Sequence, residues 1–127
     1  KRNEALITPT KTSISFRKDL QLLDYMDDQT LFHSLGFTNV HSLDVSNYEN
    51  PTHVHDLNKP VEKELHNQYD VIFDGGTMEH VFSVATVLEN IHYLLKDGGV
   101  AIHSSPCHNY VDHGFYMFSP MFFFQIL

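Results

Sequence analysis

The sequence predicts an α/β fold in which a mostly parallel β-sheet is flanked by helices. Residues 69–73 (YDVIF) form a short run of β-branched and aromatic side chains, which is typical of a buried central strand. The apolar positions that follow with a helical period are Val84, Val87, Leu88, Ile91, Leu94 and Leu95. We expect Gly98 and Gly99 to end this helix and residues 100–102 to begin a second apolar strand. This order predicts one βαβ unit with parallel strands.

Two helices are predicted before the first strand. Residues 16–26 (FRKDLQLLDYM) carry an apolar face at helical spacing, and Thr12 or Ser13 is suited to the N-cap. Residues 28–35 predict a shorter helix. This second helix is expected to end at Gly36, because glycine readily adopts the left-handed conformation that terminates helices.

Further strands alternate with these helices. Residues 40–45 (VHSLDV) and residues 52–57 (THVHDL) each predict a strand that contains an acidic residue near its end. Near the end of the chain, Ser119 and Pro120 predict the N-cap and the first residue of another helix, because proline is preorganised for that position. The alternation favours a parallel sheet with helices on its faces.

Composition restricts the partners and the setting of the chain. The 127 residues fit a single domain, and a formal net charge of −8 with scattered basic residues argues against nucleic acid as the main partner. Cys107 is the single cysteine, which excludes an internal disulfide and favours a reduced, cytoplasmic setting. No apolar run approaches the roughly 18 residues of a membrane span, so we expect no membrane partner. Because the chain begins at Lys1 and ends inside an apolar run, we expect a truncated domain.

Four predicted strands end in polar side chains. These residues are Asp44, Asp56, Asp74 and His103. The carboxyl ends of parallel strands lie along one edge of a sheet, where α/β proteins bind their ligands. An acidic residue at such an end can accept hydrogen bonds from ribose hydroxyls. Aspartate also terminates strands and caps turns without any ligand, and this structural interpretation stays open.

The turn after residues 69–73 combines two glycines with ionisable side chains. Glycine lacks a Cβ, so the backbone at Gly75 and Gly76 can approach a ligand closely. Glu79 and His80 follow at the mouth of the expected crevice. An imidazole there can take a proton from a substrate, or it can cap or pack beneath a loop.

Ten histidines are an unusual number for this length. His53 and His55 lie on one face of a predicted strand, and with Asp56 they suggest a metal-dependent hydrolase as an alternative enzyme class. Their spacing matches no H-E-x-x-H motif, so the sequence predicts no metal site. His108 and His113 follow the last predicted strand, in a loop position suited to substrate contact.

Two segments carry a family resemblance. YDVIFDGGTMEHV, followed by VLENIHYLLKDGGVAIHSSP, resembles the region from the fourth to the fifth strand of class I S-adenosylmethionine-dependent methyltransferases. The resemblance is specific over residues 69–104 and extends more loosely back to Val40. It implies a Rossmann-like sheet in a three-layer sandwich, here incomplete, with S-adenosylmethionine as cofactor.

The resemblance also implies which residues hold the adenosine part of the cofactor. Asp44, with Val45 beside it, would bind the ribose hydroxyls. Asp56 and Leu57 would lie next to the adenine. The assignment of Asp56 and Leu57 to the adenine follows from the family pattern alone.

The methionine part of the cofactor and the acceptor would lie at the next two strand ends. Asp74, Gly75 and Gly76 match the positions that line the methionine and the transferred methyl group. His80 and His103 fall where such enzymes place groups that contact the substrate, and they are the candidate catalytic residues. The family reaction depends on holding donor and acceptor in line, with a base where the acceptor must lose a proton.

The sequence departs from the family pattern at its start. The first strand and its glycine-rich loop are not recognisable, and no GxGxxG or Walker A motif occurs, which counts against a dinucleotide or nucleoside triphosphate ligand. The sequence therefore predicts a methyltransferase that acts on a small-molecule or glycan acceptor. A degenerate, non-catalytic domain that keeps the fold as a binding module is the other alternative.

Overall fold

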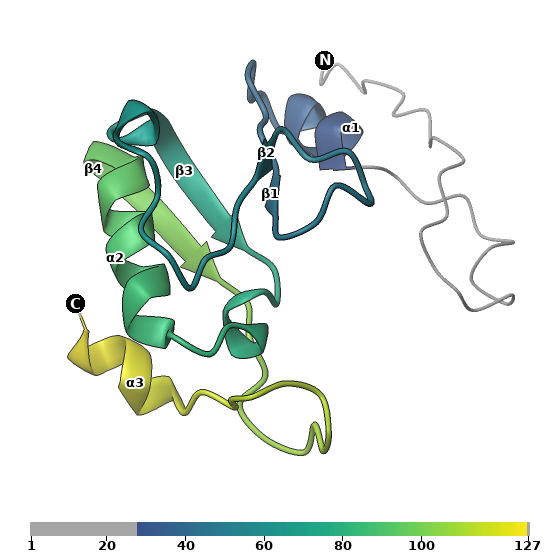
Figure 1. Cartoon of the computed structure of the whole chain (residues 1–127), viewed down its shortest axis with the longest axis vertical. Helices are drawn as coiled ribbons and strands as arrows, with labels where there is room; N and C mark the ends of the chain where they lie inside the picture. Colours follow the sequence, from purple (N-terminus) through teal and green to yellow (C-terminus); the bar gives the residue numbers. More distant parts are fainter. Residues whose placement is uncertain (1–27, 127) are drawn as a thin grey trace, which may run out of the picture. The chain divides into compact units, whose positions relative to one another are not determined.

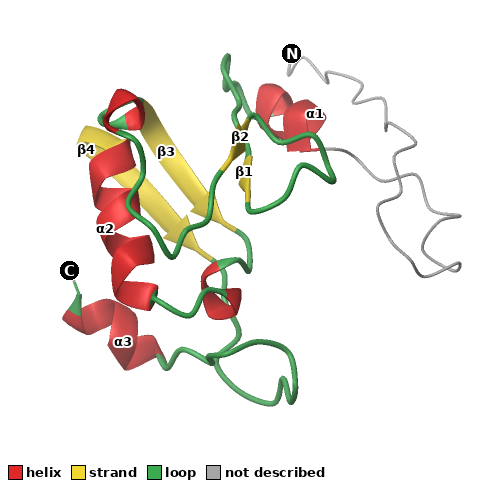
Figure 2. Ribbon diagram, in the orientation of Figure 1, coloured by secondary structure: helices red, strands yellow, loops and turns green. Residues whose placement is uncertain are grey.

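The computed structural model describes residues 28–126, and Figures 1 and 2 show its chain trace. The chain divides into two compact units, Lys1–Ser42 and Leu43–Leu127. The helix predicted over residues 16–26 and its N-cap lie outside the described residues. Among the described residues, no helix is long and apolar enough to cross a lipid bilayer.

α1 (Asp28–Ser34) is the helix of the first unit, and it confirms the short helix predicted over residues 28–35. In its first turn, the Oδ1 atom of Asp28 accepts the backbone N–H of Gln29 at 2.8 Å. The chain then passes through Gly36, whose φ of +101° lies in the left-handed region that glycine adopts without a steric clash. Gly36 therefore ends the helix as predicted.

The second unit contains the predicted βαβ unit. β3 (Tyr69–Asp74) pairs in parallel with β4 (Leu95–His103), and α2 (Val84–Leu94) connects the two strands. Figure 2 shows α2 running alongside this strand pair. The two strands end level, because Asp74 is the register partner of His103. The mixed α/β class with parallel strands is confirmed.

The described residues do not form a three-layer sandwich. Their strands make two separate two-stranded sheets, β1–β2 and β3–β4. Along β4, exposure alternates, so that Val100 and Ile102 are 53% and 47% exposed while Ala101 and His103 are half-buried. Alternate residues of a strand point to opposite faces, so α2 covers one face of this sheet. The other face, which carries Val100 and Ile102, is exposed in the part of the chain that the structure describes. A Rossmann-like sheet with helices on both faces is therefore not confirmed.

The prediction that Gly98 and Gly99 end the helix is wrong. α2 ends at Leu94, and β4 begins at the next residue. The glycines lie inside β4 at an irregularity in the register, where Tyr69 pairs with Leu95 but Val71 pairs with Val100. Gly98 has a φ of +78°, and a Cβ on Gly99 would lie 2.9 Å from the carbonyl oxygen of Lys96. The glycines allow the extra residues of β4 to bulge out of the ladder.

The first sheet of the second unit is shorter than predicted. β1 (Leu43–Asp44) and β2 (His53–Val54) are parallel strands of two residues each, whereas the sequence predicted strands over residues 40–45 and 52–57. The Oδ1 atom of Asp44 accepts the backbone N–H of Ser46, two positions on, at 2.7 Å. This turn draws the chain out of the ladder directly after β1.

The hydrophobic core lies between α2, the 3₁₀ helix η2 (Met78–His80) and the C-terminal segment. Its buried members are Met78, Val81, Val87 and Phe118. Partly buried side chains pack against them, namely Leu57, Val84, Leu88, Ile91, Tyr116, Phe122 and Phe123. The predicted apolar face of α2 is thus confirmed for the residues within the helix, whereas Leu95, which was predicted to belong to it, is the first residue of β4. α3 (Pro120–Gln125) begins after Ser119 with proline in its first turn, as predicted.

A buried asparagine fastens α2 to the segment before β3. The side chain of Asn90 is 1% exposed, and its Oδ1 atom accepts the backbone N–H of Val61 at 2.9 Å. Its Nδ2 atom donates to the carbonyl oxygens of Lys59 (2.9 Å) and Leu57 (3.3 Å). One side chain therefore satisfies three backbone groups that have left the regular elements.

We predict that Asn90→Ala lowers the free energy of unfolding by about 3 kcal/mol, because a buried N–H and two carbonyls lose their partner. Urea unfolding measures this change. Glu89→Ala is the matched control, because Glu89 is the exposed neighbour on the same helix. Equal stability of the two variants would show that Asn90 does not fasten the segment.

Candidate functional site

The carboxyl ends of β3 and β4 are joined by an aspartate–histidine pair. The Nδ1 atom of His103 lies 3.0 Å from the Oδ2 atom of Asp74. The other carboxylate oxygen, Oδ1, accepts the backbone N–H groups of Thr77 (2.9 Å) and Met78 (3.3 Å). Both oxygens of the Asp74 carboxylate therefore have partners within the protein. The residue is buried, with 7% of its surface exposed. The structure brings together two of the residues that the sequence predicted for the site.

This pair sets the chemistry that His103 can perform. A carboxylate accepts hydrogen bonds, so the Nδ1 atom of His103 carries the proton and donates it to Asp74. In the neutral ring, the lone pair is then on Nε2, which makes no hydrogen bond to the described residues. Phe123 packs against the ring at a centroid distance of 5.4 Å and limits its rotation. An imidazole oriented by a buried carboxylate is the arrangement of a general base.

The two glycines after Asp74 have a structural reason for being there. Gly76 has a φ of +94°, which side chains rarely adopt. A Cβ at this position would lie 3.1 Å from the Oε1 atom of Glu79. Gly75 is exposed. The glycines therefore allow the tight turn and the close approach of Glu79, and they leave the exposed backbone of the turn accessible to a ligand.

The other two aspartates each lie in a local turn. The Oδ1 atom of Asp44 accepts hydrogen bonds from the N–H and the hydroxyl of Ser46 at 2.7 and 3.0 Å. The Oδ1 atom of Asp56 accepts two from Asn58, and hydrogen bonding to the Asn58 side chain is the main cause of a lowered pKa for Asp56. Within residues 28–126, no hydrogen bond or ion pair links either aspartate to Asp74.

The neighbours of these aspartates differ in exposure. Val45, expected at the ribose, is 70% exposed. Leu57, expected at the adenine, packs partly buried against the core. The turns formed by Asp44 and Asp56 agree with the structural interpretation of these residues, and a role in holding a ligand stays a prediction.

His53, His55 and Asp56 do not converge on one point. The Nε2 atom of His53 lies 3.0 Å from the hydroxyl of Tyr69, and the Nε2 atom of His55 donates to the carbonyl oxygen of Lys59 at 3.0 Å. Among the described residues, the group whose ligand atoms lie close enough for a metal ion is a different one: Glu79, His80 and His113. The geometry gives no support to a hydrolase built on His53 and His55.

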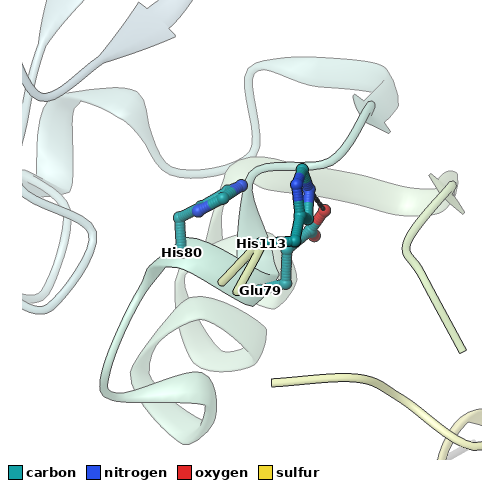
Figure 3. Close-up of side chains that lie close together, drawn as sticks. All are labelled: Glu79, His80 and His113. Carbon is teal, nitrogen blue, oxygen red and sulfur yellow. Dashed lines mark ion pairs between the residues drawn. The ribbon is translucent and has the colours of Figure 1, made fainter. Parts of the chain in front are cut away.

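His80 faces the loop that follows β4, as Figure 3 shows. The centroids of the His80 and His113 rings are 4.8 Å apart. The neighbouring residue Glu79 is buried. The sequence predicted His80 at the mouth of a crevice and His113 in a loop suited to substrate contact, but it did not predict that the two meet. They are 33 positions apart (113 − 80), and no spacing motif links them.

Comparison with protein-family models, with curated proteins and with solved structures finds no significant match to this chain. The resemblance to methyltransferases therefore stays a prediction from the sequence.

We predict a pH effect at the Tyr69–His53 contact. Burial raises the pKa of Tyr69 above its ordinary value of 10.0. The folded protein therefore holds this proton more tightly than the unfolded chain does, so the contribution to stability is present below pH 10 and is lost as the pH rises through the folded pKa. As the pH rises from 10.0 through the folded pKa, Tyr69→Phe should lose less stability than the wild type.

Urea unfolding at several pH values measures this difference. Tyr48→Phe is the control, because Tyr48 is 71% exposed and should behave like the wild type. An equal loss of stability in Tyr69→Phe and in the wild type would show that the pKa of Tyr69 does not cause the pH effect.

Proposed function

We propose that this chain is part of an S-adenosylmethionine-dependent methyltransferase that acts on a small-molecule or glycan acceptor. The observation that supports this function best is the Asp74–His103 pair at the carboxyl ends of two parallel strands. In α/β proteins this edge of the sheet is where ligands bind and react. The sequence resemblance covers the same βαβ unit.

The proposed nucleoside site fits an observation at β1. The Oδ2 atom of Asp44 accepts no hydrogen bond from the described residues, because both contacts from Ser46 use Oδ1. An acceptor is therefore available for a ribose hydroxyl. Asp56 and Leu57 are assigned to the adenine, as the resemblance implies.

The contacts of Asp74 refine its proposed role. Both of its oxygens are occupied by the turn and by His103, so we assign Asp74 to positioning His103. We assign the backbone of Gly75, which is exposed, and of Gly76, which is half-buried, to contact with the methionine part of the cofactor. S-adenosylmethionine, when bound, supplies an electrophilic methyl group. His80 is assigned to contact with the acceptor.

His103 is the proposed base. Its Nε2 atom takes the proton of an acceptor hydroxyl while the hydroxyl oxygen forms its bond to the methyl carbon and the carbon–sulfur bond breaks. Asp74 stabilises the imidazolium that results, because its carboxylate already accepts the Nδ1 proton. The products are a methyl ether, S-adenosylhomocysteine and a proton that the imidazolium later returns to water.

We predict that the chain binds S-adenosylhomocysteine and that Asp44→Asn weakens this binding by about 10-fold or more, because the ribose loses a charged acceptor. Isothermal titration calorimetry measures the affinity. Asparagine preserves the turn with Ser46, so the variant should fold.

Asp70→Asn is the matched control. Asp70 is an exposed aspartate on β3 that forms an ion pair with Lys96 (2.8 Å), and this substitution removes the same charge. It should leave the affinity unchanged. The absence of binding by the wild type would contradict the proposed function, and equal affinities of the two variants would remove Asp44 from the site. Binding of S-adenosylhomocysteine without methyl transfer to any acceptor would favour the non-catalytic alternative.

A further inference from the structure

Glu79 has a buried carboxylate that is only partly compensated. Its side chain is 1% exposed, and its Oε2 atom is buried without a hydrogen-bond partner. Its Oε1 atom lies 3.5 Å from the Nε2 atom of His113, which is longer than a typical hydrogen bond. No lysine among the described residues forms an ion pair with Glu79. Burying such a group is unfavourable unless positive charge or further donors reach it.

Two imidazoles lie beside this carboxylate. One ligand atom from each of Glu79, His80 and His113 lies within 4.8 Å of the others. Figure 3 shows Glu79 and His80 on η2, with the imidazole of His113 beside Glu79. We propose that Glu79, His80 and His113 bind a divalent transition-metal ion. This site is separate from the proposed nucleoside site, and its test needs no S-adenosylmethionine.

The backbone holds the two halves of the site together without an ion. The carbonyl oxygen of Glu79 accepts the N–H groups of Phe115 (2.8 Å) and Tyr116 (3.3 Å). The chain approaches so closely that a Cβ on Gly114 would lie 2.8 Å from the same oxygen. The neighbouring residue is His113, so these contacts place its imidazole against Glu79. Such preorganisation lowers the cost of assembling a metal site.

The ligand set selects the kind of ion. Two imidazole nitrogens and one carboxylate favour Zn²⁺ or Co²⁺ over Mg²⁺ and Ca²⁺, which prefer oxygen ligands. Zinc lies about 2.0–2.2 Å from nitrogen and oxygen ligands, so the ligand atoms, which lie within 4.8 Å of one another, must move closer together when the ion binds. The side chain of His80 is exposed and therefore free to rotate. Three protein ligands leave one coordination position open. His80 is exposed, so water or an oxygen-bearing ligand can reach that position.

A metal ion explains features that an ion pair alone does not. An ion pair between Glu79 and His113 uses Oε1 and leaves Oε2 without a partner. It also does not involve the neighbouring imidazole of His80. A divalent ion compensates the carboxylate and uses both imidazoles. The contribution of His80 therefore distinguishes the two explanations.

The test is a titration of the chelator-treated chain with Zn²⁺, followed by calorimetry. We expect one ion per chain, and we expect His80→Ala and Glu79→Gln to weaken the affinity by about 100-fold or more, since even residues that only orient ligands contribute 10–100-fold. When Co²⁺ is added in place of Zn²⁺, the protein solution should show the visible absorption bands of protein-bound Co²⁺. Zn²⁺ should also raise the Tm of the wild type but not that of Glu79→Gln.

His108→Ala is the matched control. Like His80, His108 is exposed, and it lies in the same loop as His113, so its loss removes one imidazole without disturbing the core. Its affinity for Zn²⁺ should equal that of the wild type. The proposal is overturned if the wild type binds no Zn²⁺, or if His80→Ala binds it as tightly as His108→Ala does. Because His80 is exposed, its variant decides the question even if Glu79→Gln folds poorly.

Discussion

The carboxylate of Asp74 is the constraint on which both candidate sites depend. One of its oxygens binds the backbone at the start of η2, and the other binds His103 at the end of β4. It therefore fixes the direction in which the chain leaves β3 and, at the same time, the orientation of the imidazole on the neighbouring strand. Because Asp74 is buried, water competes little for these hydrogen bonds.

The direction of η2 also determines which of its side chains are buried and where the loop after β4 contacts it. Met78 enters the core with no exposed area, and the next residue, Glu79, is also buried. The carbonyl oxygen of Glu79 then receives the loop after β4, which brings His113 to the same place. The turn after β3 thus holds the proposed base His103 through Asp74 and places the proposed metal ligands Glu79 and His80 beside His113. The two sites share their scaffold but none of their proposed functional side chains except His80.

Local sequence patterns predicted the strands and the helix of the βαβ unit. They did not predict where these elements begin and end. The apolar period of α2 was sufficient, because its face packs against the core. The effect of Gly98 and Gly99 was misjudged, since glycine permits a bulge in a strand as readily as it ends a helix, and only pairing with β3 distinguishes the two. The strands around Asp44 were predicted too long because the turn to Ser46 competes with the ladder.

By itself the sequence determined the order of strands and helices, the parallel βαβ unit and the presence of Asp74 and His103 at strand ends. These features follow from periodicity and from the fixed direction of parallel strands, which depend on nearby residues alone. Only the tertiary structure decided which polar groups meet. The approach of His113 to Glu79 and the local turns of Asp44 and Asp56 depend on how loops pack and close, and loop contacts between distant residues leave no periodic signal in a sequence.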